Sequence, residues 1–282
     1  MGERRRSRDA RPEPKAFRLG ERDIRIMQGL ARMKLARTTM LQRLYFGDRS
    51  TASRRLAKLV ALKLANVFVP HLNSENVYGL SERGRVVLLE RGVDDNEIHV
   101  GRSIRRADLE HLLAINEVRV ALVRGCRGSN ITIDFFRSDS DLRRLAGLTP
   151  PSYLPDALVR LRSGSVTTGL VIEVDTGSEG SRYFLSRKVE PLASIAASSG
   201  DVWGLRPWRP ILVTLTTGRL RRLAGVLATH GGSQIWLGTT VELLNRLGPT
   251  GLVAVTLSEA ANAPTDGDLV PRHPIFVPAK VP

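Results

Sequence analysis

Two alternating runs of apolar residues, PDALVRLRSG and TTGLVIEVDTG, constrain the fold of this chain more than any other feature. The short turn SGSV separates them, so they predict an antiparallel β-hairpin over residues 154–164 and 167–177. Asp156 opens the first run, and Glu173 and Asp175 close the second. Because residues two apart in a strand share a face, the hairpin should bring these three carboxylates to one end of a sheet.

Three carboxylates in one place repel each other unless a cation is present. Oxygen ligands favour Mg²⁺ or Mn²⁺ over zinc, and such an ion polarises a phosphate and activates water. Lys188, on the helix expected next in the chain, could lean over the site. The alternatives are a metal site that binds without cutting and ordinary solvated charges at strand ends.

The excess of positively charged residues indicates a nucleic-acid partner. Lys and Arg number 43 against 28 Asp and Glu, which gives a formal net charge of +15 and a pI of about 11.1, and most of the positive residues are arginines. Such a chain typically binds nucleic acid, although a high-GC genome also enriches arginine codons. No apolar run is long enough to span a membrane, so we expect a cytoplasmic protein with no membrane partner.

The first part of the chain has the pattern of a winged helix-turn-helix. Helical spacing predicts helices over residues 21–34, 38–46 and 50–64, followed by a hairpin over 65–81 and a short helix over 81–92. The third helix would enter the major groove of DNA and the hairpin would form the wing. Residues expected to contact DNA, from the third helix and the wing tip, are Ser50, Thr51, Ser53, Arg54, Arg55, Lys58, His71 and Asn73. A helical hairpin with solvated arginines is the alternative interpretation.

The second part of the chain predicts a mixed sheet with helices. After a linker over residues 93–107, the patterns indicate a helix over 108–125, a strand over 130–139, the hairpin described above and a helix over 178–200. Two further strand–helix pairs follow, whereas residues 141–152 and the Pro-rich tail from 262 read as irregular. His111, on the first of these helices, is better explained by packing or hydrogen bonding within the domain than by catalysis.

At Pro155-Asp156 and Glu173-Val174-Asp175 the chain resembles the PD-(D/E)XK nuclease superfamily. Taken over residues 21 to about 217, it is similar to the bacterial replication-relaxation family. The matching segments are RRLAKLVALKL, VYGLSERG, HLLAINEV, PDALV, IEVDTGSE and SRKVEPL, and their order and spacing carry the resemblance.

The resemblance implies a winged helix joined to a nuclease-like domain, with an association with plasmids and mobile elements and with relaxing or nicking DNA. It implies that Asp156 and Glu173 are metal ligands. Asp175 stands where the family has its lysine, and some members move that lysine to the next helix, where this chain has Lys188. Glu117 lies where nuclease-like domains often add an acidic residue.

The expected fold class is therefore α+β, with a disordered basic arm over residues 1–18, a winged helix over 19–92, a linker over 93–107, a nuclease-like domain over 108–260 and a tail over 261–282. The expected function is metal-dependent nicking or relaxation of plasmid or mobile-element DNA, with Asp156, Glu173, Asp175 and Lys188 as catalytic residues. Asp156, Glu173, Asp175 and Glu117 are the expected ligands of Mg²⁺ or Mn²⁺. The alternative is a non-catalytic winged-helix transcriptional or replication regulator with a degenerate nuclease fold. Double-stranded DNA is the expected partner, with a homodimer or a larger plasmid or mobile-element complex as the assembly.

Overall fold

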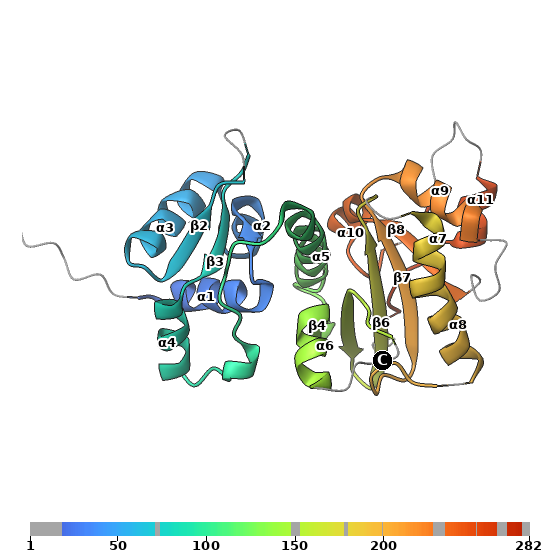
Figure 1. Ribbon diagram of the computed structural model, residues 1–282, viewed down its shortest axis with the longest axis horizontal. Helices are drawn as coiled ribbons and strands as arrows, with labels where there is room; N and C mark the ends of the chain where they lie inside the picture. The colour runs from blue at the N-terminus through green and yellow to red at the C-terminus, as the bar shows by residue number, and fades with distance from the viewer. Residues whose placement is uncertain are drawn as a thin grey trace, which may run out of the picture.

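A computed structural model describes residues 19–70, 74–147, 153–177, 180–198, 200–227, 235–251, 253–263 and 270–277. The chain combines a three-stranded sheet in its first part with a six-stranded mixed sheet in its second (Figure 1). This confirms the expected mixed α+β class. None of the described helices has the length and the apolar composition needed to cross a membrane.

The N-terminal part, residues 19–92, begins with α1 (Glu21–Met33), β1 (Ala36–Arg37), α2 (Thr38–Tyr45) and α3 (Arg49–Ala61). A hairpin of β2 (Ala65–Phe68) and β3 (Val77–Leu80) follows, and then α4 (Glu82–Glu90). The three strands are antiparallel in the order β1-β3-β2. The order of helices and hairpin expected from the sequence is present, and β1 is an addition that pairs with the hairpin.

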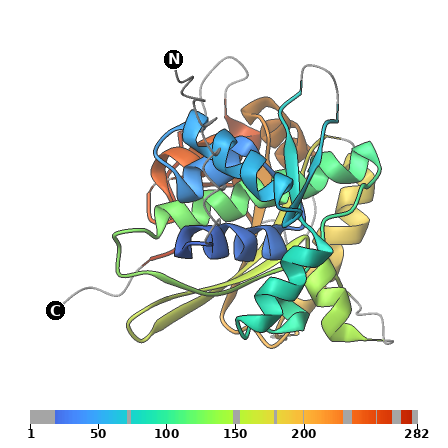
Figure 2. The same ribbon diagram turned by 90° about the vertical axis from the view of Figure 1, so that its left-hand side faces the viewer.

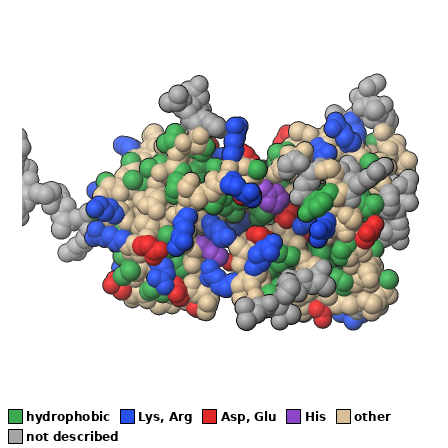
Figure 3. Space-filling model, viewed as in Figure 1, with side chains coloured by type: hydrophobic (Ala, Val, Ile, Leu, Met, Phe, Trp, Pro, Cys, Tyr) green, Lys and Arg blue, Asp and Glu red, His purple; other side chains and the backbone are tan. Residues whose placement is uncertain are grey.

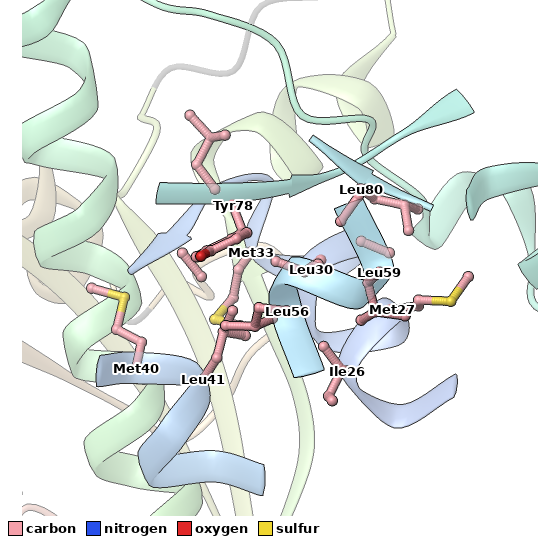
Figure 4. Close-up of a cluster of buried hydrophobic side chains, with 14 of the residues drawn as sticks. Ile26, Met27, Leu30, Met33, Met40, Leu41, Leu56, Leu59, Tyr78 and Leu80 are labelled. Atoms are coloured by element: carbon pink, nitrogen blue, oxygen red, sulfur yellow. The ribbon is translucent and has the colours of Figure 1, made fainter. Parts of the chain in front are cut away.

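Helical spacing in α1 explains the core of the N-terminal part. Ile26, Met27, Leu30 and Met33 are all at most 1% exposed, and they meet apolar side chains from α2, α3 and β3 (Figure 4). Burying each such side chain contributes about 1.5–3 kcal/mol.

One carboxylate also enters this core. Asp23 is fully buried, accepts a hydrogen bond from the Gly20 N–H at 2.8 Å and forms an ion pair with Arg55 of α3. This ion pair fixes the start of α1 against α3.

The second part starts with α5 (Arg106–Gly125), β4 (Thr132–Ser138) and α6 (Asp139–Ala146). The predicted hairpin is β5 (Ala157–Ser163) and β6 (Val166–Asp175), which pair antiparallel from Ser163–Val166 to Ala157–Ile172. Next come α7 (Ser181–Phe184), the π-helical segment η2 (Leu185–Val189) and α8 (Glu190–Ala197). The remaining elements are β7 (Trp208–Thr214), α9 (Thr217–Leu227), β8 (Leu237–Thr240), α10 (Val241–Leu247), β9 (Val255–Thr256) and α11 (Leu257–Asn262).

The six-stranded sheet lies between two layers of helices (Figure 1). Its order is β4-β5-β6-β7-β8-β9, with β6, β7 and β8 parallel and the other pairs antiparallel. Alternating residues of each strand point to opposite faces of the sheet and belong to two different cores. Ile172 packs toward α5 and α10, whereas Val171 packs toward α7, α8 and α9.

Helix α5 belongs to both parts of the molecule. Its Leu109, Leu113 and Val120 lie in the N-terminal core, while Ile115 and Val118 lie under the six-stranded sheet. Figure 1 shows α5 between the two parts, and Figure 2 shows the blue N-terminal helices in front of it, with the β2–β3 hairpin projecting at the top.

Polar side chains of α5 strengthen this junction. Asn116, 3% exposed, donates hydrogen bonds to the carbonyls of Met33 at 2.8 Å and Leu35 at 2.9 Å. Arg119 donates to the Arg32 carbonyl at 2.6 Å. These donors satisfy two carbonyls of the last turn of α1, which have no partner within that helix, and one just beyond it.

Two segments differ from the expectation of irregular structure. Residues 139–146 form helix α6, because Ser138 and Asp141 make a capping box at its start. The tail is irregular where it is described, but Ile275 and Phe276 are 1% exposed and pack beneath the sheet. The tail therefore completes a core.

Candidate functional site

Asp156 and Glu173 meet at the open end of the β5–β6 hairpin. The register pairs Ala157 with Ile172, so the residues just beyond this pair lie side by side. The Val174 N–H donates to Asp156 Oδ2 at 2.8 Å, which fixes the Asp156 carboxylate against β6. Glu173 faces the layer that contains α7 and α8, because it alternates with Ile172 on the opposite face.

Lys188, from η2, lies between the two carboxylates. Its Nζ is 3.2 Å from Asp156 Oδ1, 2.7 Å from Glu173 Oε2 and 3.4 Å from the Leu154 carbonyl oxygen. The contact with Glu173 is at ion-pair distance without hydrogen-bond geometry, so Oε2 is buried without a hydrogen bond to the described residues. The structure thus brings together three of the four residues expected to be catalytic.

The two carboxylates differ in acidity. Burial and the nearby charge of Asp156 raise the pKa of Glu173 well above its ordinary value, and Tyr153 donates a hydrogen bond to Oε1. Burial would also raise the pKa of Asp156, but His111, Lys188 and the Val174 N–H together lower it to about 2. Asp156 is therefore anionic at neutral pH, whereas the proton affinity of Glu173 is high.

Burial alone would lower the pKa of Lys188, but the charges of Glu173 and Asp156 outweigh this effect and raise it. Lys188 is 16% exposed, Asp156 13% and Glu173 0%. The site is consequently a largely buried cluster in which one ammonium faces two carboxyl groups.

Asp175 shares the face of Glu173 but has another partner. Its carboxylate forms a two-point ion pair with Arg219 of α9, with 3.0 Å between Nη2 and Oδ1. Asp175 is therefore held toward α9, whereas Asp156 and Glu173 hold Lys188.

Glu117 is also engaged elsewhere. It pairs with Arg43 of α2, which in turn donates to Asn245 of α10 at 2.9 Å. The residue that α5 does bring to the site is His111, whose Nε2 is 3.4 Å from Asp156 Oδ1 and whose side chain is 37% exposed. His111 was expected to pack or to form a hydrogen bond within the domain, and this contact with Asp156 is consistent with that expectation.

The donor set can be compared with the needs of a divalent ion. Over the described part of the chain, no group of three or more His, Cys, Asp and Glu side chains is placed to hold a metal. Mg²⁺, however, is commonly held by one or two carboxylates and completed by substrate phosphates and water. Asp156 and Glu173, whose Oε2 contacts Lys188 without hydrogen-bond geometry, fit that incomplete type of site. Asp175 and Glu117 are paired with Arg219 and Arg43 and do not contribute in this arrangement.

Six of the eight residues expected to bind DNA lie on α3. Ser50, Ser53, Arg54 and Lys58 are exposed, and Thr51 is half-buried. Arg55 differs, because it forms an ion pair with the buried Asp23 and so links α3 to α1. His71 and Asn73 lie outside the described residues.

Local contacts fix α3 and the hairpin. Asp48 caps α3 by accepting from the Thr51 N–H at 2.8 Å. Glu75, just after the hairpin tip, accepts from the Thr39 N–H at 2.6 Å and so ties the hairpin to the start of α2. On the face shown in Figure 3, Lys and Arg side chains gather over the N-terminal part and along its junction with the second part.

Two residues of the site region, Tyr153 and Arg219, were not identified from the sequence, and the contact of His111 with Asp156 was not foreseen. Tyr153 lies two residues before the Pro155-Asp156 pair, and this closeness in sequence was a usable signal. Arg219 lies 44 residues from Asp175, and His111 lies 45 residues from Asp156, so no local pattern connects them.

Comparisons with known proteins agree with the resemblance seen in the sequence. Curated proteins gave no match to the chain, and neither did solved structures. A family model described as replication-relaxation matches residues 27–204, which is more than half of the 282 residues and runs from α1 through α8 and beyond the cluster. The chain belongs to the replication-relaxation family.

Proposed function

We propose that this protein binds duplex DNA through a winged helix-turn-helix and hydrolyses a phosphodiester bond at the Asp156–Glu173–Lys188 cluster. The biological substrate would be plasmid or mobile-element DNA undergoing replication or relaxation. The observation that carries the catalytic half is the lysine ammonium held between two buried carboxylates at a strand end.

The DNA-binding half rests on α3. The element order α1-β1-α2-α3-β2-β3 has the helices and hairpin of a winged helix, and α3 presents Ser50, Ser53, Arg54 and Lys58 to solvent. Hydroxyl groups and arginines donate to phosphates and base edges. Residues 19–92 contain 14 Lys and Arg against 6 Asp and Glu, which favours attraction to the phosphate backbone.

Fluorescence anisotropy with labelled duplex DNA, measured over a salt series, tests this half. The Arg54→Ala and Lys58→Ala variants should bind more weakly, and each should reduce the slope of log K against log salt by about one if it removes a phosphate contact. Arg91→Ala, at an exposed position at the end of α4, is the control. Unchanged affinity in both α3 variants would contradict the proposed docking.

For the catalytic half, Asp156 and Glu173 would hold Mg²⁺ or Mn²⁺, which when bound polarises the phosphate and lowers the pKa of water. Lys188 can donate to a phosphate oxygen, because its ammonium is compact and its stem flexible. His111, at the exposed side of Asp156, can contact the entering strand and hold or release a proton at Nε2.

Nicking of supercoiled plasmid in Mg²⁺ or Mn²⁺ tests the catalytic half. Asp156→Ala and Glu173→Gln should abolish nicking, while Asp134→Asn, which alters a carboxylate on neighbouring β4, should retain it. If the unmodified protein and Asp156→Ala are equally inactive, the enzymatic proposal fails.

One observation favours a second candidate, a regulator that binds DNA without cutting it. Asp175 is paired with Arg219, so among the described residues two carboxylates, Asp156 and Glu173, remain at the cluster. A regulator would prefer one sequence strongly over random DNA, need no divalent ion and tolerate Glu173→Gln. Affinity for selected and random duplexes with EDTA present distinguishes the two candidates.

A further inference from the structure

The Lys188 ammonium is surrounded by oxygen atoms. Asp156 Oδ1 lies at 3.2 Å, Glu173 Oε2 at 2.7 Å and the Leu154 carbonyl at 3.4 Å. An ammonium has three N–H donors, and here three oxygens face it. Lys188 therefore occupies the position between the carboxylates where another cation would bind.

A divalent ion would use the same two carboxylates. Mg²⁺ binds oxygen at about 2.0–2.1 Å, so an ion shared by Asp156 and Glu173 would lie close to the present position of Nζ. Two cations that close repel strongly in a buried site, where the effective dielectric constant is low. Lys188 and a divalent ion thus compete for these carboxylates.

The net charge of the cluster indicates what would allow Lys188 and a divalent ion to stay at the site together. With both carboxylates ionised, the cluster of Asp156, Glu173 and Lys188 carries one negative charge. Adding a divalent ion changes this to one positive charge, and adding a phosphodiester as well restores neutrality. A phosphate oxygen would also give the displaced ammonium a new acceptor.

We propose that Lys188 is an internal cation that holds Asp156 and Glu173 together in the free protein, and that a divalent ion binds tightly only when a nucleic-acid phosphate accepts the ammonium. The competition between Lys188 and the ion stands on the geometry alone, and the coupling to DNA rests on the proposed function. Lys188 lies in the π-helical segment η2, an irregularity that often marks functional positions in helices.

Mn²⁺ titration followed by electron paramagnetic resonance tests the competition, because it reports free ion and requires no activity. Lys188→Met should bind Mn²⁺ about tenfold more tightly than the unmodified protein, since a unit positive charge beside the ligands is removed. The double variant Lys188→Met/Glu173→Gln should lose this gain. Arg219→Met, which removes the cation paired with Asp175, is the control and should show no gain.

The unmodified protein tests the coupling and remains informative if Lys188→Met does not fold. A short duplex should raise its Mn²⁺ affinity about tenfold, with Asp156→Asn and the same duplex as the control for ions bound by DNA itself. Tight Mn²⁺ binding without DNA that the duplex does not increase would overturn the proposal, as would unchanged affinity in a folded Lys188→Met. A gain in Lys188→Met without plasmid nicking by the unmodified protein would support the competition while refuting the catalytic proposal.

Discussion

Replacing Asp156 by asparagine should destabilise the protein in a manner that depends on pH. Asparagine keeps an oxygen that accepts the Val174 N–H, so the substitution removes mainly the charge that faces Lys188 and His111. The pKa of Asp156 is lowered from an ordinary 3.8 to about 2 in the folded protein. This difference corresponds to about 2 kcal/mol of free energy of unfolding at pH 7, and the side chain is only 13% exposed, so solvent screens it little.

The sign follows from the direction of the shift. A carboxyl with a lowered folded-state pKa stabilises the protein fully above its unfolded value, and this contribution is lost as pH falls toward the folded value. The gap between the unmodified protein and Asp156→Asn should therefore be about 2 kcal/mol at pH 7 and about half of that at pH 3.

Urea unfolding followed by tryptophan fluorescence, at pH values from 7 to 3, measures this gap. Asp134→Asn, on neighbouring β4, is the matched control, because its ion pair with Arg162 is largely at the surface and should contribute at most about 1 kcal/mol. If the gap for Asp156→Asn stays constant between pH 7 and 3, the electrostatic account of this residue is wrong.

Three further predictions concern stability. Glu173→Gln should have the opposite pH dependence, because the raised pKa of Glu173 means that stability is lost as pH rises through the folded-state value; urea unfolding between pH 5 and 9 should show a smaller loss in the variant. Asp23→Asn should cost about 3 kcal/mol by removing the buried carboxylate that pairs with Arg55, and an equal midpoint of thermal unfolding would contradict this. Asn116→Ala should cost about 2 kcal/mol by removing two donors from carbonyls of the N-terminal part, and faster hydrogen exchange at the end of α1 should accompany the loss.

The sequence was most informative where one segment determines its own pairing. The β5–β6 hairpin follows from strict alternation and a tight turn, and it is this hairpin that places Asp156 beside Glu173. Lys188 could also be predicted as a site residue, because it lies on the helical segment that directly follows the hairpin. These three positions needed only local periodicity and a short connection.

Positions set by long-range packing could not be predicted in this way. The partner of Asp175 comes from α9, and the approach of His111 to Asp156 depends on how α5 crosses the sheet. Helix α6 was predictable, since Ser138 and Asp141 have the spacing of a capping box, but the prolines that follow favoured an irregular segment. The π-helical geometry of η2 leaves no recognisable pattern in the sequence.

The sharing of α5 between two cores has a consequence for the products of a cleavage reaction. Asn116, which anchors the N-terminal part, and His111, which reaches Asp156, are about 7.5 Å apart along one helix axis. A duplex bound by α3 would therefore reach the cluster at a constant distance from the base pairs that α3 contacts. Nicks made by such a molecule would fall a fixed number of base pairs from the bound sequence, and mapping the broken ends by primer extension would yield one sharp band.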